Sequence, residues 1–429
     1  MSTLLLSKEI AILSGVRTPY LYHPQEVSQI GGLALGAALF REAIYRSEIL
    51  SHQVDEVLFS QGSFYPSLPY SPHKIASLAG IPQDRTCFSI AHYEPSGLQA
   101  AALAIQRLHK ENRKVILVAS VESYEAYPWL YSPLFHHFLQ KKWYGQRAWK
   151  RFLHLVNFRF AYLKPFFLIQ NYRRQIAQQG ELLAKRFGIR REEQDRYVQR
   201  SHRLAIQSLE QNKEWSEIMP LHLPPDYESF VEKDALPQEN LSLEELAKKA
   251  PLLEEGTLTD QHIAHFCENG SALVLAHKSF VEEKGLSPLG YIRGFEFSGC
   301  KKKSNSLASI LAAYKLLKKA KLNMSDMDLI NIHEGSSTLV LACEKLMNSP
   351  SHLQNYLGIS EAFGPLDMEK VNVSGGALAY GCAMGTVGIH LVLSLLRELI
   401  HRKLRYGLVL VSSNHCEGGA MIIENATLP

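Results

Sequence analysis

S-I-A-H-Y-E-P-S-G-L-Q, residues 89–99, is the stretch on which the fold prediction rests. Small and apolar residues continue after it on helical spacing through Leu108, and Pro95 stands where a helix is expected to begin. The pattern predicts a strand that ends in a turn, followed by a helix. A side chain in that turn faces the helix N-terminus, where N–H groups stabilise negative charge. Here it is Glu94, whose simplest role is to complement the helix dipole.

Outward from this turn, the apolar patterns alternate between strands and helices over most of the chain. The N-terminal part predicts strands at 10–16, 55–59 and 115–119, with helices at 33–47, 73–79 and 100–108. The C-terminal part predicts strands at 291–297, 328–332 and 406–412, the last of them closing the sheet, with helices at 305–320, 338–347 and 385–400. Alternation of this kind indicates an α/β protein, and the repeated order indicates two similar halves.

The composition indicates an ordinary globular protein and argues against several classes of function. The chain has 429 residues, 46% hydrophobic and 21% charged, as in ordinary globular proteins. A formal net charge of +4 gives no electrostatic reason to expect nucleic acid. Six cysteines lack any C-x-x-C pair and the histidines lack ligand spacing, so we expect neither a metal nor a disulfide framework. The N-terminus lacks a signal-like apolar run, which predicts a cytoplasmic location.

Residues 126–180 differ from their surroundings in charge. They contain no Asp or Glu but nine Lys or Arg, interleaved with Trp, Tyr and Phe. Such a mixture suits the headgroup layer of an anionic membrane, where rings enter and cations stay hydrated. It equally suits a docking surface for another protein. The composition therefore predicts peripheral membrane contact through 137–175, or a protein interface there.

Several longer motifs, in this order, resemble the thiolase superfamily, and most closely the β-subunit of the trifunctional fatty-acid β-oxidation complex. They are V-R-T-P at 16–19, A-S-V-E-S at 119–123, R-E-E-Q-D-R-Y-V-Q-R-S-H at 191–202, G-T-L-T at 256–259, H-E-G-S at 333–336 and V-N-V-S-G-G-A-L-A-Y-G at 371–381. The resemblance implies a duplicated thiolase fold, with two βαβαβαββ halves in five layers, α-β-α-β-α. It implies an N-terminal half at 1–125, an inserted loop domain at 126–250, a return at 251–285 and a C-terminal half at 286–429.

Carried over position by position, the resemblance implies a substituted active site. Glu94 stands at the place of the family's nucleophilic Cys, Cys382 at the His of its Gly-His-Pro, and Ser412 at its second Cys. His333 keeps the His of the His-Glu-Ala-Phe motif. A carboxylate is a poor nucleophile toward a thioester, and losing one member of a cooperating set removes most of the rate. Standard thiolysis of a 3-ketoacyl-CoA is therefore not expected.

Three functions stay open at this point. The first is a thiolase homologue without catalysis that binds acyl-CoA or regulates a partner. The second is an acyltransferase-family enzyme with altered chemistry, such as decarboxylation, hydrolysis or condensation of a CoA thioester, using Glu94 as acid or base beside His333 and Cys382. In a variant, His333 deprotonates a nucleophilic Cys382. The third is a membrane-docking scaffold.

The expected ligand is a coenzyme A thioester, with no bound cofactor. The expected partners, implied by the resemblance, are an identical chain, another thiolase or a trifunctional α-subunit-like protein.

Overall fold

The computed structural model describes residues 9–22, 30–62, 72–110, 113–123, 164–211, 217–224 and 227–428. Most of the basic and aromatic segment predicted to contact a membrane or a partner lies outside these ranges. The predicted boundaries of the inserted loop domain fall partly there as well, so the domain limits stay predictions.

Within these ranges, nine strands form one sheet in the order β3-β2-β4-β7-β1-β8-β11-β10-β9. The bounds are Ile10–Arg17 (β1), Glu56–Gln61 (β2), Thr86–Ala91 (β3), Val115–Glu122 (β4), Asn269–His277 (β7), Gly290–Gly299 (β8), Leu329–Ile332 (β9), Tyr406–Ser412 (β10) and Glu417–Asn425 (β11). A separate ribbon pairs Leu221–His222 (β5) with Phe230–Val231 (β6).

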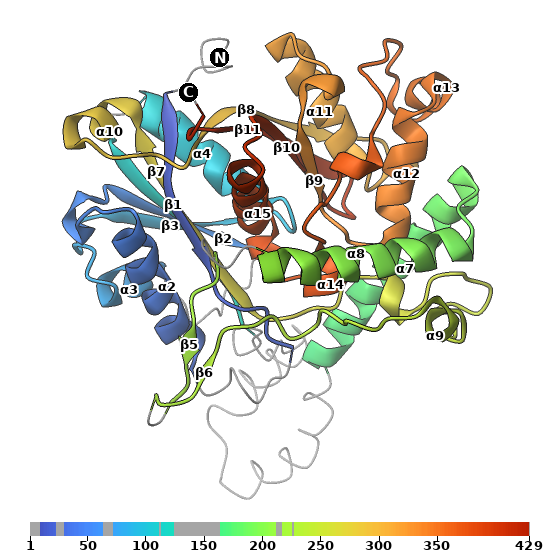
Figure 1. Cartoon of the computed structure of the whole chain (residues 1–429), viewed down its shortest axis with the longest axis horizontal. Coiled ribbons are helices and arrows are strands. Elements are labelled where there is room, and N and C mark those ends of the chain that lie inside the picture. Colours follow the sequence, from blue (N-terminus) through green and yellow to red (C-terminus); the bar gives the residue numbers. More distant parts are fainter. Residues whose placement is uncertain are drawn as a thin grey trace, which may run out of the picture.

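The principal helices lie on the outer faces of the two sets of strands and between them (Figure 1). In the N-terminal half they are Gly32–Arg46 (α2), Pro72–Leu78 (α3), Ser96–Lys110 (α4) and Lys278–Lys284 (α10). Lys164–Phe187 (α7), Arg191–Gln211 (α8) and Leu243–Ala247 (α9) lie between β4 and β7 in sequence, as an insertion within the N-terminal half. In the C-terminal half they are Ala308–Ala320 (α11), Ser337–Met347 (α12), Pro350–His352 (α13), Ala377–Tyr380 (α14) and Val387–His401 (α15).

The two halves repeat one strand order, which confirms the duplication predicted from the sequence. Numbered within each half, the N-terminal strands lie in the order third, second, fourth, fifth, first. The C-terminal strands mirror this as first, fifth, fourth, second, and Val371 bridges Ile330 at the place of the third. The halves meet where β1 pairs with β8 through Ala11 and Ile12, so their sheets continue into one another.

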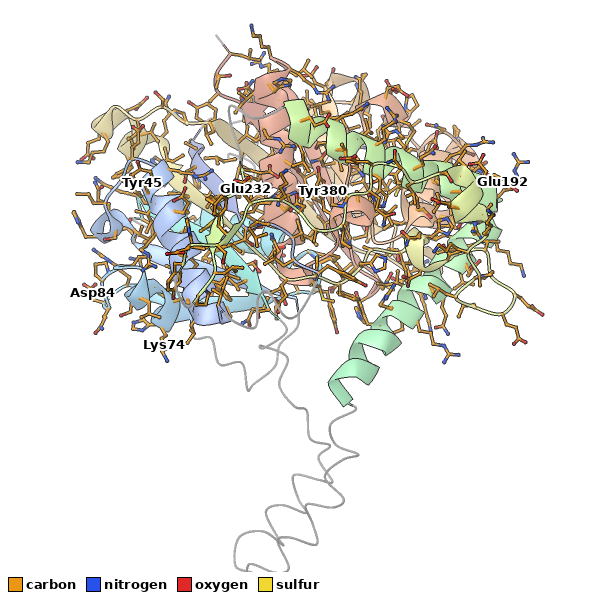
Figure 2. The ribbon with its side chains drawn as sticks, turned by 60° about the horizontal axis from the view of Figure 1, so that its bottom comes forward. Tyr45, Lys74, Asp84, Glu192, Glu232 and Tyr380 are labelled. Atoms are coloured by element: carbon orange, nitrogen blue, oxygen red, sulfur yellow. The ribbon has the colours of Figure 1, made fainter. Side chains whose placement is uncertain are left out.

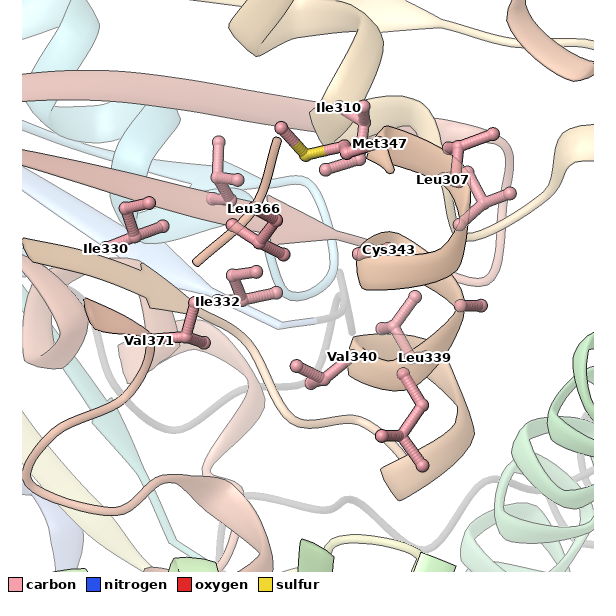
Figure 3. Close-up of a cluster of buried hydrophobic side chains, with 14 of the residues drawn as sticks. Leu307, Ile310, Ile330, Ile332, Leu339, Val340, Cys343, Met347, Leu366 and Val371 are labelled. Atoms are coloured by element: carbon pink, nitrogen blue, oxygen red, sulfur yellow. The ribbon is translucent and has the colours of Figure 1, made fainter. Parts of the chain in front are cut away.

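Three buried clusters between these elements produce the five layers. One packs α2, α3 and α10 on the outer face of the N-terminal strands. The middle cluster holds α4 and α15 between the strands of both halves. The third packs α11 and α12 on the outer face of the C-terminal strands, and Figure 3 shows part of it, with Ile332 of β9 close to Val340 of α12. The layer order α-β-α-β-α agrees with the prediction.

The helix that contains Met384–His401 is long and apolar enough to cross a membrane, with 18 residues and a mean hydropathy of 1.2. However, 89% of this window is buried inside the fold, where α15 lies between the two halves (Figure 1). Hydrophobic residues on all sides are typical of a helix buried in the core of a large protein.

The apolar pattern predicts 406–412 as the last strand and a further strand over 256–275, and the structure differs at both places. A further strand, β11, follows 406–412 and pairs with both β10 and β8. The pair Gly418-Gly419 in this strand suggests a turn from its sequence, but both glycines pack tightly against neighbouring elements. A Cβ at Gly418 would lie 2.4 Å from the Ser309 nitrogen, and a Cβ at Gly419 would lie 2.6 Å from the Phe297 ring. These glycines permit close packing within a strand. Residues 256–268 form a loop around the short helix Asp260–His262, and the strand begins only at Asn269.

Candidate functional site

Glu94 lies in the predicted turn, between β3 and α4. The helix begins at Ser96, so Pro95 precedes it and contributes the carbonyl that accepts the N–H of Gln99, at 2.9 Å. The Ser96 hydroxyl accepts the N–H of His92 at 2.8 Å and donates to the carbonyl of Gln61 at 2.6 Å. These bonds fix the turn to the end of β2, and they place Glu94 with 4% of its surface exposed.

A small cavity brings together three of the four residues predicted for the site: Glu94, His333 and Ser412. Its volume of about 10 Å³ leaves room for about one water molecule. Cys382, the fourth, does not line it. The remaining lining comes from α7, the start of α12 and the loops beside β10: Ile176, Gln179, Gly180, Leu183, Ser306, Gly335, Ser336, Leu339 and Asn414.

The Glu94 carboxyl group is held by a tyrosine that sequence analysis did not single out. The hydroxyl of Tyr172 donates to Glu94 Oε1 at 2.5 Å, while Oε2 is buried without a hydrogen-bond partner among the described residues. Burial raises the pKa of Glu94 to about 7, and the Tyr172 hydrogen bond opposes part of that rise. Near neutral pH, Glu94 is therefore divided between its acid and its carboxylate form.

Aromatic rings stack beside this hydrogen bond. The Tyr93 ring lies parallel to that of Tyr172, with 6.5 Å between centroids, and 4.0 Å from the ring of His415. Tyr172 belongs to the segment predicted to meet a membrane or a partner, yet it packs inward. The helical spacing of these residues could have predicted the buried position of Tyr172. Tyr172, Ile176, Gln179 and Leu183 lie on one face of α7, and the last three line the cavity.

His333, directly after β9, faces the same cavity as a neutral imidazole. Its backbone N–H donates to the carbonyl of Leu410 at 2.9 Å, which fixes the end of β9 against β10. Burial lowers the pKa of the ring to about 4, because a charged imidazolium would be poorly solvated there. At neutral pH the ring can donate one hydrogen bond and accept another.

Glu334, the next residue in the chain, does not line the cavity. Its side chain joins the end of β9 to α8 and to the glycine-rich motif. Its carboxylate accepts the hydroxyls of Tyr197 and Ser201 on α8, both at 2.7 Å. It also accepts Asn372 Nδ2 at 2.8 Å and the N–H of Leu378 at 3.1 Å. Much of the motif at 191–202 and of the glycine-rich motif at 371–381 thus serves to hold this one buried carboxylate.

Ser412, at the end of β10, has its hydroxyl occupied by α11. Ser412 Oγ donates to Ser309 Oγ at 2.7 Å and accepts the N–H of Ser309 at 3.1 Å. A hydroxyl bonded in this way fastens β10 to the start of α11. It replaces the acid/base thiol that the resemblance implies at this place with a group of much higher pKa.

Cys382 is buried in the middle core, 4% exposed, away from the cavity lining. Burial raises the pKa of its thiol well above the ordinary value, and the charges of Glu94 and Glu122 raise it further. Among the described residues, no hydrogen bond joins Cys382 to His333. The geometry therefore gives no support to a Cys382 nucleophile activated by His333, and the residue packs as a small apolar side chain.

Glu122, at the end of β4, is a second buried carboxyl group close to this region. Its Oε1 accepts the N–H groups of Gly62 at 2.6 Å and Gly385 at 3.0 Å, which ties β2 to the segment before α15. Burial raises its pKa to about 7 against the effect of these bonds. In the part of the chain that the structure describes, no three His, Cys, Asp or Glu side chains are grouped to hold a metal ion.

Fold and site together define a duplicated α/β protein in which both halves contribute polar side chains to one small cavity: Glu94 from the first, His333 and Ser412 from the second. The chain belongs to the thiolase family. Residues 10–279 match the model of the thiolase N-terminal domain, and residues 286–425 match that of the thiolase C-terminal domain.

Relatives and solved structures cover nearly the whole chain. It is 28% identical over 423 residues to a 3-ketoacyl-CoA thiolase of Colwellia psychrerythraea and 29% over 424 residues to one of Pseudoalteromonas translucida, covering 97% of each chain in both comparisons. The acetyl-CoA acetyltransferase of Bacillus anthracis has a similar fold, with a TM-score of 0.82 and 24% identity over 99% of this chain and 100% of that one. The structure of human mitochondrial 3-ketoacyl-CoA thiolase in complex with CoA is also similar, with a TM-score of 0.78 and 21% identity over 98% of this chain and 99% of that one.

Proposed function

We propose that this chain is a thiolase homologue of fatty-acid and acyl-CoA metabolism that does not perform standard thiolysis. One observation carries the proposal: the turn that the resemblance equates with the family's nucleophile holds Glu94, hydrogen-bonded by Tyr172 over a cavity with room for about one water. A carboxylate attacks a thioester poorly, so we do not expect the acyl-enzyme that thiolysis requires to form at Glu94. The role that remains is to bind an acyl-CoA or to regulate a partner.

The neighbouring groups favour the same conclusion. Thiolysis needs a thiolate and an acid/base partner near the thioester. The only predicted site thiol, Cys382, is kept protonated by burial and by two nearby carboxyl groups, and the Ser412 hydroxyl is bonded to Ser309. His333 alone keeps a form that could bind an oxyanion.

A thiolysis assay tests this proposal directly. Purified wild-type chain, Glu94→Cys and the surface control Glu254→Cys would each be given CoA and 3-ketoacyl-CoAs of several chain lengths, with intact-mass spectrometry of the protein. We expect no turnover and no acyl adduct for the wild type. CoA-dependent cleavage by the wild type, or an acyl group on any cavity residue, would overturn the proposal.

A second function has one specific observation in its favour, the pKa of about 7 at Glu94. A carboxyl group that titrates near neutral pH suits general acid/base catalysis, here hydrolysis, decarboxylation or condensation of a CoA thioester. The test is release of CoA from acyl-CoA and 3-ketoacyl-CoA across pH 5 to 9. Activity with an apparent pKa near 7 that disappears in Glu94→Gln but persists in Glu254→Gln would establish this chemistry.

The expected homodimer, or heterodimer with another thiolase, is also a proposal. Strand β3 forms one end of the sheet, and Cys87, Phe88 and Ile90 on it are only half-buried. An edge strand with half-buried apolar residues suits pairing with a second chain. Light scattering during gel filtration gives the mass: a monomer at micromolar concentration would contradict the homodimer, and co-purification with an active thiolase would favour the heterodimer.

Peripheral membrane contact through 137–175, a trifunctional α-subunit-like partner and the cytoplasmic location remain predictions from the sequence. Co-sedimentation with anionic vesicles tests the first, using wild type and a variant with Lys141, Lys142, Lys150 and Arg151 changed to Gln. Binding that salt and these substitutions both weaken is expected for headgroup contact. Absent or salt-insensitive binding would contradict it.

A further inference from the structure

A second concave region lies apart from the Glu94 cavity and shares no lining residue with it. It is a groove of about 390 Å³ between one face of α8, the segment 369–373 and the C-terminal end of α15. Its volume falls within the roughly 300–1,000 Å³ range of small-molecule sites. Four of its eight lining residues are arginines and one is acidic: Arg196, Gln199, Arg200, Arg203, Leu204, Glu369, Val373 and Arg402.

Two backbone carbonyl groups hold the side chain of Arg200, which lines this groove. Its Nη2 donates to the carbonyl of Met368 at 2.7 Å and to that of Val371 at 2.9 Å. Its Nη1 is buried and has no hydrogen-bond partner among the described residues. The two bonds of Nη2 hold the guanidinium group of Arg200 in one orientation, so its positive charge is fixed in the groove wall.

The other arginines surround Arg200 with positive charge. Arg196, Arg200 and Arg203 recur at intervals of four and three residues, which places them on one face of α8. Arg196 and Arg203 are exposed. Arg402 approaches from the end of α15, where its Nε donates to Glu398 Oε2 at 2.8 Å. The groove thus presents three exposed guanidinium groups around the fixed Arg200, with Glu369 as its single lining acid.

We propose that this groove binds a small molecule that carries two or more phosphate groups, such as a nucleoside diphosphate. The planar guanidinium fork matches phosphate oxygens in pairs, and several forks around one concavity favour a polyanion over a single charge. The groove is too large for one inorganic phosphate, and its polar lining does not suit an acyl chain. The inference does not depend on the chemistry at Glu94.

Calorimetric titration of the full-length chain tests the site, with inorganic pyrophosphate and ADP as probes at low salt. Arg196→Gln/Arg203→Gln removes the two exposed cations that α8 contributes to the groove and leaves the bonds of Arg200 unchanged. Arg174→Gln/Arg190→Gln is the matched control. Both arginines are exposed and lie outside the groove lining, and the double substitution removes the same amount of positive charge. We expect the groove variant to weaken pyrophosphate and ADP binding about tenfold or more, and the control less than about twofold.

Three results would overturn the proposal. One is no binding of either probe by the wild type. Another is equal weakening in the groove and control variants, which would indicate a general charge effect. The third comes from vesicles of phosphatidylcholine with or without phosphatidylinositol phosphates: binding to the phosphorylated vesicles without binding of soluble pyrophosphate or ADP would assign the arginines to a lipid headgroup instead. Circular dichroism spectra that match the wild type show that each variant is folded.

Discussion

Glu94 holds its proton more tightly in the folded chain than in the unfolded chain, with a pKa of about 7 against an ordinary value of 4.5. Between those values the folded state binds the extra proton, so this residue makes stability fall as pH rises from about 4.5 through 7. Glu94→Gln removes that dependence and keeps an acceptor for Tyr172. We expect the variant to exceed the wild type in free energy of unfolding by about 3 kcal/mol at pH 8 and by little at pH 4.5.

Urea titrations at half-unit pH intervals measure this difference. Glu254→Gln, an exposed loop residue, is the control and is expected to follow the wild type throughout. If the gap between Glu94→Gln and the wild type stays constant with pH, the carboxyl group has the same pKa in the folded and unfolded states, and the account of its burial is wrong.

Tyr172→Phe isolates the hydrogen bond to Glu94. That bond favours the charged carboxylate and holds its pKa down, so removing the hydroxyl should raise the pKa of Glu94 above about 7. NMR titration of carbon-13 labelled glutamate carboxyl groups, assigned through Glu94→Gln, measures the change. Tyr197→Phe, whose hydroxyl bonds Glu334 instead, should leave the Glu94 titration in place. An unshifted Glu94 in Tyr172→Phe would mean that the two side chains do not touch in solution.

At the scale of elements, the buried Glu334 carboxylate ties β9, α8 and the glycine-rich motif together. Gly376 permits this, because a Cβ there would lie 2.3 Å from the Glu334 Cδ. We expect Glu334→Ala to cost about 3 kcal/mol or more, since several donors lose their acceptor, and Tyr197→Phe about 1 kcal/mol. Urea unfolding at pH 7 measures both. Comparable losses in the two variants would contradict a shared acceptor.

Arg17, from the V-R-T-P motif, fastens the segment 217–235 to β1. This fully buried guanidinium donates to Glu217 Oε1 at 2.7 Å and, through two nitrogens, to Asp234 at 2.7 and 2.8 Å. Asp234→Ala leaves a buried cation short of a partner, which typically costs about 3 kcal/mol.

Limited proteolysis should then release 217–235 first in Asp234→Ala, at a protease concentration that the wild type resists. Asp84→Ala, a substitution at an exposed aspartate at the rim of the N-terminal half, should change nothing (Figure 2). Equal cleavage of both variants would show that Arg17 does not restrain the segment.

At the scale of the whole molecule, neither half has a complete core. Helix α4 of the first half and α15 of the second share one buried cluster with strands of both, and Figure 2 places Tyr380 in the middle of the molecule between the halves. We expect residues 1–285 and 286–429, expressed alone, to be insoluble or molten, and the intact chain to unfold in one transition. A cooperative transition in either isolated half would contradict a shared core.

Some site residues could be predicted because their environment is local. Glu94 is placed by its own turn, while His333 follows one predicted strand and Ser412 ends another. These two strands pair in parallel, so their ends meet at one edge of the sheet. Cys382 could not be excluded from the sequence, because only packing decides whether a loop cysteine faces the cavity. Tyr172 was missed for the opposite reason: its cationic neighbours suggested a surface, although its helical spacing indicated a buried face.

The sequence by itself determined the alternation of strands and helices, the duplication, the family and the carboxylate at the strand–turn–helix site, because periodicity and motif order are properties of the chain. Only the tertiary structure decided that β11 completes the sheet and that Tyr172 reaches Glu94. It also decided that Cys382 does not line the cavity and that four arginines line one groove. Those facts depend on contacts between residues far apart in the chain, and burial, which moves the Glu94 pKa, exists only once both halves have packed.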